Sequence, residues 1–215
     1  MKGLLLTMTE PPAHMEEEFN AWYDSEHLPK RLSIPGFISA RRWVDAAAPV
    51  GTGKYLASYE LEHPQVFESA AYLAHVGDNF TPWSKRCLSH CVLFRRWACS
   101  QIFPGDAAPD AEAQALFLVC GDVPAEHEAE FNKWYDSEHM PLLAAVPGVL
   151  RARRFLAVEG KPRYIALYEL ADANVADSAA WNSALATPWA KRVDTLTQDG
   201  EWILATYVAY EPAAK

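Results

Sequence analysis

The same histidine-containing block occurs twice in this chain, and its residue types are suited to proton transfer. Phe19–Pro29 reads Phe-Asn-Ala-Trp-Tyr-Asp-Ser-Glu-His-Leu-Pro, and Phe131–Pro141 repeats it 112 residues later with two positions changed. The histidines are His27 and His139. Imidazole has a reference pKa of about 6.5, so it can take or give a proton near neutral pH. Core packing tolerates many apolar combinations and does not require one order of polar and aromatic residues. The duplication therefore indicates a chemical role for at least one histidine.

A tyrosine and an aspartate lie one helical turn before each histidine, within reach of its ring. A carboxylate there can orient the imidazole and hold its tautomer. The candidate catalytic residues are His27, His139, Tyr23, Tyr135, Asp24 and Asp136. The alternative is a helix C-terminal cap, in which the imidazole bonds the last carbonyls and the acidic residues face solvent. The sequence leaves both interpretations open.

Aromatic and basic residues in the neighbouring segments are candidates for binding a substrate. An arginine that faces a pocket can stabilise a developing enolate or phenolate. Glu26 and Glu138 are expected to pair with arginines of the following strands, and service as a base is the alternative for these carboxylates. The tyrosines either line a pocket or belong to the core with a hydroxyl at its rim. The candidate substrate-binding residues are Trp22, Arg41, Tyr55, Tyr59, His75, Asn79, Trp83, Tyr164 and Tyr168.

The pattern of apolar residues predicts the same element order in both halves. Glu16–Glu26 has acidic residues in its first turn and aromatic residues at helical spacing, which predicts a helix. Pro29 disfavours helical geometry at the preceding residue, so this helix should end near His27. The remaining elements of the first half are predicted as strands at Leu4–Met8, Phe37–Val44, Tyr55–Leu61 and Leu88–Trp97, with a helix at Val66–His75.

Each half thus reads β-α-β-β-α-β, the order of a ferredoxin-like unit with helices on one face of a four-stranded sheet. The bare face of such a sheet must be covered. We expect an α+β protein in which two tandem ferredoxin-like repeats form an intrachain pseudo-dimeric α+β barrel. The repeats are predicted at residues 1–102 and 113–215, joined by a linker at residues 103–112.

At the repeated block the chain resembles the dimeric α/β-barrel superfamily, and within it EthD-like proteins. The resemblance rests on an aromatic-rich helix that ends in histidine followed by proline, here Trp22-Tyr23 through His27 and Pro29, and again in the second copy. Fusion of two units in one chain departs from the usual single unit. The resemblance implies a small, hydrophobic, often aromatic substrate, and the superfamily includes cyclases, oxygenases, isomerases, lyases, dehalogenases and haem enzymes.

The leading functional hypothesis is a lyase or isomerase that works without a cofactor on a small hydrophobic aromatic metabolite, with His27 or His139 moving the proton. The first alternative is an EthD-like, cofactor-free oxygenase acting on a phenolic substrate. A haem-binding barrel with an axial histidine is the second. The third is a ligand-binding module without catalytic activity.

Composition narrows the possible partners. The net charge of −9 argues against nucleic acid and anionic membranes. No apolar stretch approaches the length of a transmembrane helix. The four cysteines contain no CxxC pair, which argues against a zinc site. We expect a cytoplasmic protein with no metal ion, and a homodimer beyond the intrachain pseudo-dimer is possible.

The two halves are expected to differ in their pockets. Alignment on the repeated Thr-Pro-Trp sets His75 against Trp181 and Asn79 against Leu185. The first half then has polar groups where the second has bulky apolar ones. We expect one dominant ligand site near His27 and His75, and a smaller, drier second cavity; drift of a surface loop is the alternative.

The expected architecture has a direct test. The two halves should superpose as ferredoxin-like units, and their sheets should pack face to face. An experimental structure with the repeats apart, each sheet face bare or covered by another element, would contradict this prediction.

Overall fold

The structure is a computed structural model that describes residues 1–45 and 47–212. Its contacts divide the chain into two compact units of similar size. The first unit contains Met1–Ser100, Val158–Gly160 and the chain from Tyr210. The second contains Gln101–Ala157 and Lys161–Ala209. The two units are described separately below, and the linker and repeat boundaries expected from the sequence stay a prediction.

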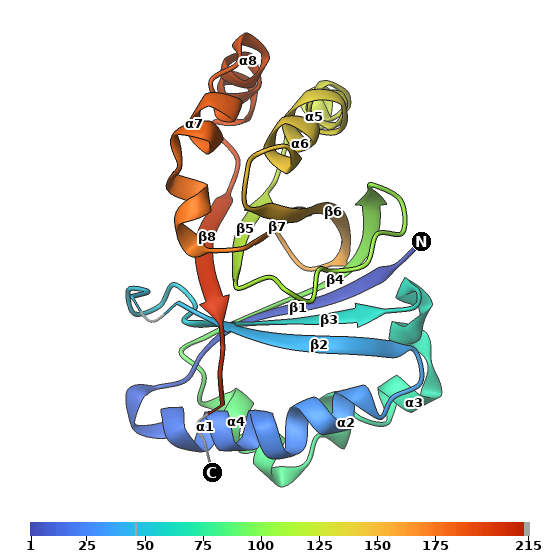
Figure 1. Cartoon of the computed structure of the whole chain (residues 1–215). Coiled ribbons are helices and arrows are strands. Elements are labelled where there is room, and N and C mark those ends of the chain that lie inside the picture. The colour runs from blue at the N-terminus through green and yellow to red at the C-terminus, as the bar shows by residue number, and fades with distance from the viewer. Residues whose placement is uncertain (46, 213–215) are drawn as a thin grey trace. The chain divides into compact units, whose positions relative to one another are not determined.

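The first unit has a four-stranded antiparallel sheet in the order β4-β1-β3-β2. In chain order its strands are β1 (Gly3–Glu10), β2 (Phe37–Val44), β3 (Tyr55–Leu61) and β4 (Leu93–Phe103). Its α-helices are α1 (Glu16–Trp22), α2 (Leu28–Leu32), α3 (Ala70–Leu73) and α4 (Pro82–Ser89). These helices lie on one face of the sheet (Figure 1). Leu5, Ala57 and Tyr59 from the sheet pack there against Phe19 and Trp22 of α1.

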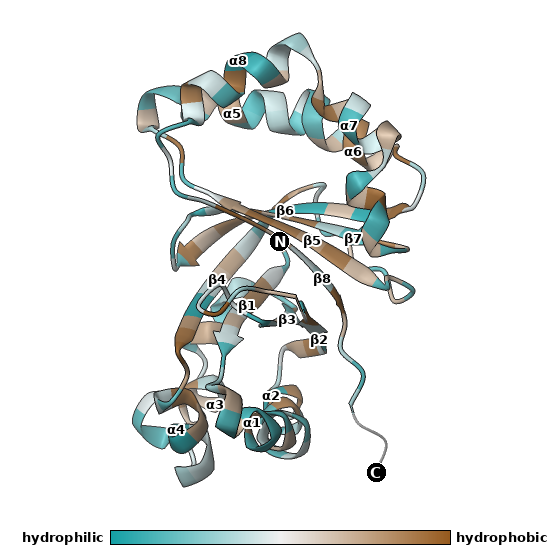
Figure 2. Ribbon diagram, turned by 90° about the vertical axis from the view of Figure 1, so that its left-hand side faces the viewer, coloured by the Kyte–Doolittle hydropathy of each residue, from teal (hydrophilic) through white to brown (hydrophobic). Residues whose placement is uncertain are grey.

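The second unit repeats this arrangement with the strand order β8-β5-β7-β6. In chain order its strands are β5 (Ala115–Gly121), β6 (Val149–Glu159), β7 (Tyr164–Leu170) and β8 (Trp202–Ala209). Its α-helices are α5 (Glu128–Trp134), α6 (Met140–Ala144), α7 (Ala179–Leu185) and α8 (Pro188–Thr197). In both units, brown apolar strands lie beside helices that alternate between teal and brown, as expected for helices buried along one face (Figure 2).

Short helical turns complete both units. Single 3₁₀ turns lie at Ala13–Met15, Pro64–Glu68, Gly77–Asn79, Ala125–His127 and Ala173–Asp177. The α+β class is confirmed. How the two sheets pack against each other stays a prediction. Within the described residues, no helix is long and apolar enough to cross a membrane.

The predicted end of the first helix at His27 is wrong. After α1 the chain forms a π-helical segment, η2 (Tyr23–His27), and then continues as α2 through Pro29. The second unit has the same insertion, η6 (Tyr135–His139), before α6. A proline inside an α-helix clashes with the carbonyl one turn earlier and has no N–H to offer. The wider π turn before each proline changes that geometry, so the helix bends onward instead of ending.

The predicted strand at Leu88–Trp97 also starts too early. Thr81 caps α4 by accepting a hydrogen bond from the Ser84 amide, and the helix runs to Ser89. The cap and Pro82 at the first turn are both favourable helix starts. They override the apolar pattern of the residues that follow, and β4 begins only at Leu93.

The turn before β2 provides a test of local packing. Gly36 has φ +94°, and a Cβ placed there would lie 2.4 Å from Cγ2 of buried Val66. Gly51 has φ +86° with open space around it. Gly51→Ala should lower the free energy of unfolding by about 1–2 kcal/mol through backbone strain alone. Gly36→Ala should lower the free energy of unfolding by about 1–3 kcal/mol more, because the new Cβ also displaces the buried side chain beside it. Urea unfolding of both variants measures the difference, and equal losses would contradict the predicted clash.

Candidate functional site

The π-helical segment places each histidine between two aromatic rings. In the first unit the His27 ring lies 4.4 Å from the Trp22 ring and 5.0 Å from the Tyr23 ring, centroid to centroid. In the second unit, His139 lies 4.2 Å from Trp134 and 4.6 Å from Tyr135. An α-helix stacks residues three or four apart. The extra residue in the π turn also brings the residue five positions earlier against the histidine.

Both histidines are buried and uncharged at neutral pH. Burial is the main cause that lowers the pKa of His27 well below its usual value, and the cations Arg31, Arg42 and Lys30 lower it further. Burial, together with Arg154, lowers the pKa of His139 to about 3. A neutral imidazole has a free ring nitrogen that can accept a proton. The helix-cap alternative requires a partly exposed imidazolium, which these environments disfavour.

The aspartate of the repeated block binds an arginine. Asp24 accepts a 2.5 Å hydrogen bond from Arg42 Nη1, and Asn20 accepts one of 2.5 Å from Arg42 Nη2. In the second unit, Asp136 and Asn132 hold Arg154 in the same way. The predicted orientation of the imidazole by Asp24 and Asp136 is therefore corrected. A buried guanidinium must be paired, and here the aspartate and the asparagine one turn before it provide the acceptors.

The glutamates beside the histidines serve as links between helices. Glu26 accepts hydrogen bonds from Thr81 and Ser84 at the start of α4, and lies 3.5 Å from Lys30. Glu138 accepts hydrogen bonds from Thr187 and Trp134. The expected pairs between these glutamates and the strand arginines are wrong, because the aspartates already occupy Arg42 and Arg154.

Each unit contains a cavity between its helices and its sheet. The cavity of the first unit measures about 340 Å³. Its wall includes His27, Trp22 and Tyr23 from the repeated block, Tyr72 from α3, and two arginines, Arg31 and Arg96. Arg31 is 6 % exposed, and its Nη1 has no hydrogen-bond partner. The guanidinium of Arg31 lies over the Tyr72 ring at 5.3 Å. This cavity thus combines a neutral base with a buried cation that has a free donor.

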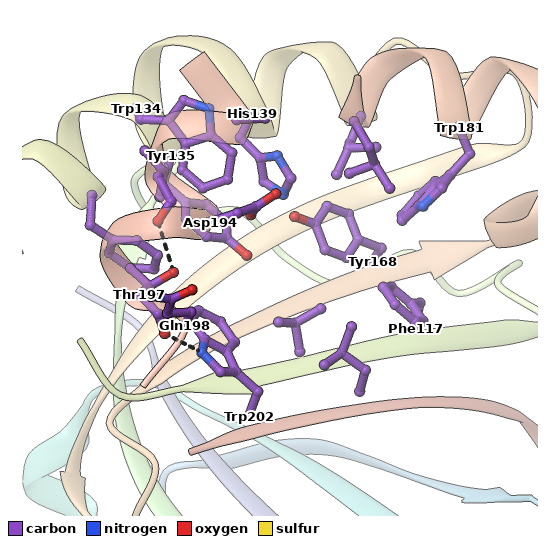
Figure 3. A pocket seen from close by; sticks show the side chains of 17 residues that line it. Phe117, Trp134, Tyr135, His139, Tyr168, Trp181, Asp194, Thr197, Gln198 and Trp202 are labelled. Carbon is purple, nitrogen blue, oxygen red and sulfur yellow. Dashed lines mark hydrogen bonds between the residues drawn. The ribbon is translucent and has the colours of Figure 1, made fainter. Parts of the chain in front are cut away.

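The cavity of the second unit measures about 370 Å³ and is lined mainly by aromatic and aliphatic side chains. His139 from η6, Tyr168 from β7 and Trp181 from α7 point into it, as Figure 3 shows. Asp194 and Trp202 lie on the wall nearer α8. Burial raises the pKa of the Asp194 carboxyl.

The four tyrosines predicted to bind substrate differ in whether they reach a cavity. Tyr55 and Tyr164 bind polar residues of the first helix of their units: Glu16 and Asn20, and Glu128 and Asn132. Neither lines a cavity. Tyr59 is fully buried and donates a 2.9 Å hydrogen bond to Tyr23, which lies 3.2 Å from Thr7. Of the four, Tyr168 is the one on the described wall of either of these two cavities.

Several other predicted residues lie outside the main cavities. Arg41 stacks on the Trp43 ring at 4.3 Å. Trp83 is half-buried against the core. His75 is exposed with Nδ1 2.9 Å from the Ala71 carbonyl, and Asn79 donates to the Leu73 carbonyl. These two border only a hollow of about 30 Å³ beside His27. Trp22 does line the first cavity, as predicted.

The prediction that the second cavity is smaller than the first is wrong, since the second cavity is slightly larger. The error comes from aligning the two halves on the repeated Thr-Pro-Trp. Ser69 caps α3 at the Tyr72 amide, and Ser178 caps α7 at the Trp181 amide. Trp181 is therefore the counterpart of Tyr72, not of His75. The length difference falls after these caps, where the first unit has its additional turn Gly77–Asn79.

The sequence did not point to the two cavity arginines because the halves were compared for differences only around His75 and Asn79. Arg31 follows His27 by four residues, and the same position in the second unit is Leu143. Arg96 lies opposite Thr7 on β1, and Leu204 lies opposite Val119 at the equivalent place on β5. Comparing the halves for differences one turn after each histidine would have identified Arg31.

The residues of these cavities do not fit haem. A haem needs room for a macrocycle and cations for its two carboxylates. Each cavity is near the lower limit for small-molecule sites. The described wall beside His139 has no lysine or arginine and includes Asp194. Beside His27, Arg96 already pairs with Glu159, which leaves Arg31 as one described cation for two carboxylates. The part of the chain that the structure describes also has no group of three or more His, Cys, Asp or Glu placed to hold a metal ion.

Comparison with known proteins gives structural relatives only. No family model and no curated protein sequence match the chain. An anthrone oxidase-like protein is 13 % identical with a TM-score of 0.66, covering 98 % of this chain and 91 % of its own. A monooxygenase-type protein from Lactobacillus acidophilus NCFM is 11 % identical with a TM-score of 0.57, covering 98 % and 99 %. A mutant chlorite dismutase from Candidatus Nitrospira defluvii, in complex with cyanide, is 6 % identical with a TM-score of 0.61, covering 98 % and 91 %.

These similar structures support the α+β-barrel type of fold that the resemblance implied. They do not test the EthD-like placement. The hypothesis of a lyase or isomerase is corrected, because the similar structures are described as monooxygenases and an anthrone oxidase-like protein. At these identities the likeness concerns the fold alone.

The depressed pKa of His139 predicts how stability depends on pH. The unfolded histidine binds a proton below about pH 6.5, whereas folded His139 does so only near pH 3. The unfolded state therefore binds more protons in this window. Stability should fall by up to about 1.4 kcal/mol per pH unit as the pH drops from about 6.5 toward 3. His139→Gln should flatten this dependence, and His75→Gln, at an exposed site, should not. Urea unfolding at several pH values measures both variants, and parallel curves for wild type and His139→Gln would contradict the prediction.

Proposed function

We propose that this protein is a cofactor-free oxygenase that acts on a small phenolic aromatic compound in the cavity of the first unit. The observation that carries the proposal is the pair of a neutral buried imidazole, His27, and an unpartnered buried guanidinium nitrogen, Arg31 Nη1, on one cavity wall. The described wall also contains two threonines and the pair of Arg96 with Glu159, and its remaining side chains are mainly aromatic and aliphatic, which suits an aromatic ring.

The first step in this proposal is deprotonation. The free nitrogen of His27 takes the proton of a phenolic hydroxyl, or of the carbon that tautomerises with it. Negative charge then spreads over the oxygen and a ring carbon. Arg31 stabilises that charge because a cation in a water-poor cavity acts more strongly than in water. Arg96 and the hydroxyl of Thr7 lie on the same wall.

The electron-rich anion can then react with molecular oxygen as the second substrate. A C–O bond forms, oxygen takes two electrons, and the peroxide receives the proton held by His27. Removal of the remaining hydrogen on that carbon breaks the O–O bond, giving a carbonyl and water. Overall, one CH₂ group and one O₂ become one C=O group and one H₂O. The protein supplies the base, the cation and a pocket with little water.

The finer family placement is also a proposal. We propose that the chain is a tandem member of the EthD-like group, with two fused ferredoxin-like repeats. The support is the repeated block, the shared π turn and the matching element order of the two units.

Variants at the base and the cation test the oxygenase proposal. Anthrone, whose enol form is phenolic, is a suitable probe, with oxygen uptake and quinone absorbance as readouts above the uncatalysed rate. His27→Gln should lower kcat/KM by about a hundredfold or more. Arg31→Leu, which copies Leu143, should also lower it about a hundredfold, the usual effect of losing one charge-stabilising donor. His75→Gln, at an exposed site, is the control.

Unfolding transitions near the wild-type temperature would show that the variants are folded. Full activity in the double variant His27→Gln/His139→Gln would exclude histidine catalysis. If no phenolic probe consumed oxygen but the probes still bound, the non-catalytic ligand-binding alternative would be favoured.

A further inference from the structure

The second unit contains a buried hydroxyl without a hydrogen-bond partner, unlike the equivalent hydroxyl of the first unit. Tyr168 is fully buried on the wall of the second cavity, and its hydroxyl oxygen has no hydrogen-bond partner. Its counterpart Tyr59 bonds Tyr23, which in turn lies near Thr7. In the second unit, Val119 takes the place of Thr7, so this chain of hydroxyls lacks its last member. An unsatisfied buried donor costs free energy unless a ligand or water meets it.

The Tyr168 hydroxyl is a donor throughout the ordinary pH range. Burial is the main cause that raises its pKa well above the usual value, and the neighbouring Tyr135 phenol raises it further. The two phenols lie close enough to interact. Their geometry falls short of the hydrogen bond that joins Tyr59 to Tyr23, so the Tyr168 hydroxyl has no well-formed partner. Figure 3 shows the hydroxyl end of Tyr168 directed toward the space beside His139.

The charge of the two cavities also differs at equivalent positions. Arg31 and Arg96 of the first cavity are replaced by Leu143 and Leu204 in the second. Alignment on the Thr81 and Thr187 caps places Asp194 where the first cavity has Leu88. A negative side chain in a wall without a described cation disfavours anionic ligands. The second cavity is therefore suited to an uncharged molecule.

We propose that the cavity of the second unit is a separate binding site for an uncharged aromatic carbonyl compound, such as an aryl ketone. The carbonyl oxygen accepts a hydrogen bond from Tyr168, and the ring packs against Trp181, Phe117 and Trp134. Burying the carbonyl without a donor would be unfavourable, so Tyr168 selects for an acceptor. This site is assigned by binding alone and does not depend on the oxygenase proposal.

Two probes with the same ring system test this assignment on the full chain. 2-Acetylnaphthalene is an uncharged ketone, and 2-naphthoate is an anion of similar size. In calorimetry, Tyr168→Phe should weaken binding of the ketone about three- to tenfold, the usual effect of one neutral hydrogen bond. The matched variant Tyr59→Phe should leave ketone binding unchanged. No loss in Tyr168→Phe, or equal losses in both variants, would overturn the assignment.

A gain of binding provides the second measurement. Leu143→Arg installs in the second cavity the cation that the first already has. This variant should bind one more equivalent of 2-naphthoate than wild type and should bind the ketone more weakly. An unchanged stoichiometry together with unchanged ketone affinity would overturn the proposal. If anthrone were not oxidised while these binding changes occurred, the oxygenase proposal would fail and the second site would stand.

Discussion

The π turn in each unit determines where the histidine lies, and the cavity is arranged around it. Because the turn contains one residue more than an α-helical turn, the ring of His27 meets both Trp22 and Tyr23. These contacts hold the imidazole away from water, which keeps it neutral. The same turn lets the helix continue past Pro29, so that Arg31 reaches the cavity from the following turn. Short π segments are frequent at functional sites for this kind of reason.

A buried arginine in each unit ties the same helix to a strand of the sheet. Arg42 is held by Asp24 and Asn20, and its guanidinium lies 4.4 Å from the Tyr23 ring centroid. Arg154 repeats this arrangement at Tyr135, at 4.1 Å. The residues that the two copies of the block share thus have two separate structural roles. Asparagine and aspartate anchor the helix to a strand, while tryptophan, tyrosine and histidine form the cavity wall.

The sequence predicted the α+β class, the repeated element order and the importance of the block, because these depend on local periodicity and on identity between the halves. It did not predict the π turn, since the rule for residues before proline describes α-helical geometry. The partner of Asp24 was also missed: helical spacing alone suggested His27, but the burial of Arg42 creates a stronger demand for a carboxylate. His75 was overvalued because an alignment on Thr-Pro-Trp moved the length difference to the wrong side of the Ser69 and Ser178 caps.

Arg31 and Tyr168 show that, in a duplicated fold, the residues that differ between the two units determine what each cavity binds. The packing around the two histidines is nearly the same, so the shared residues account for position and burial. What each cavity can bind then depends on the few wall positions that packing leaves open. Two of them are Arg31 and Arg96 in the first cavity, and because Arg96 pairs with Glu159, Arg31 is the cation that can meet developing negative charge. Leucines at the same positions, with Asp194 on the wall, make negative charge unfavourable in the second, while the Tyr168 hydroxyl stays available to an uncharged acceptor. One scaffold can thus keep a neutral base in both units while reserving anionic chemistry for one of them.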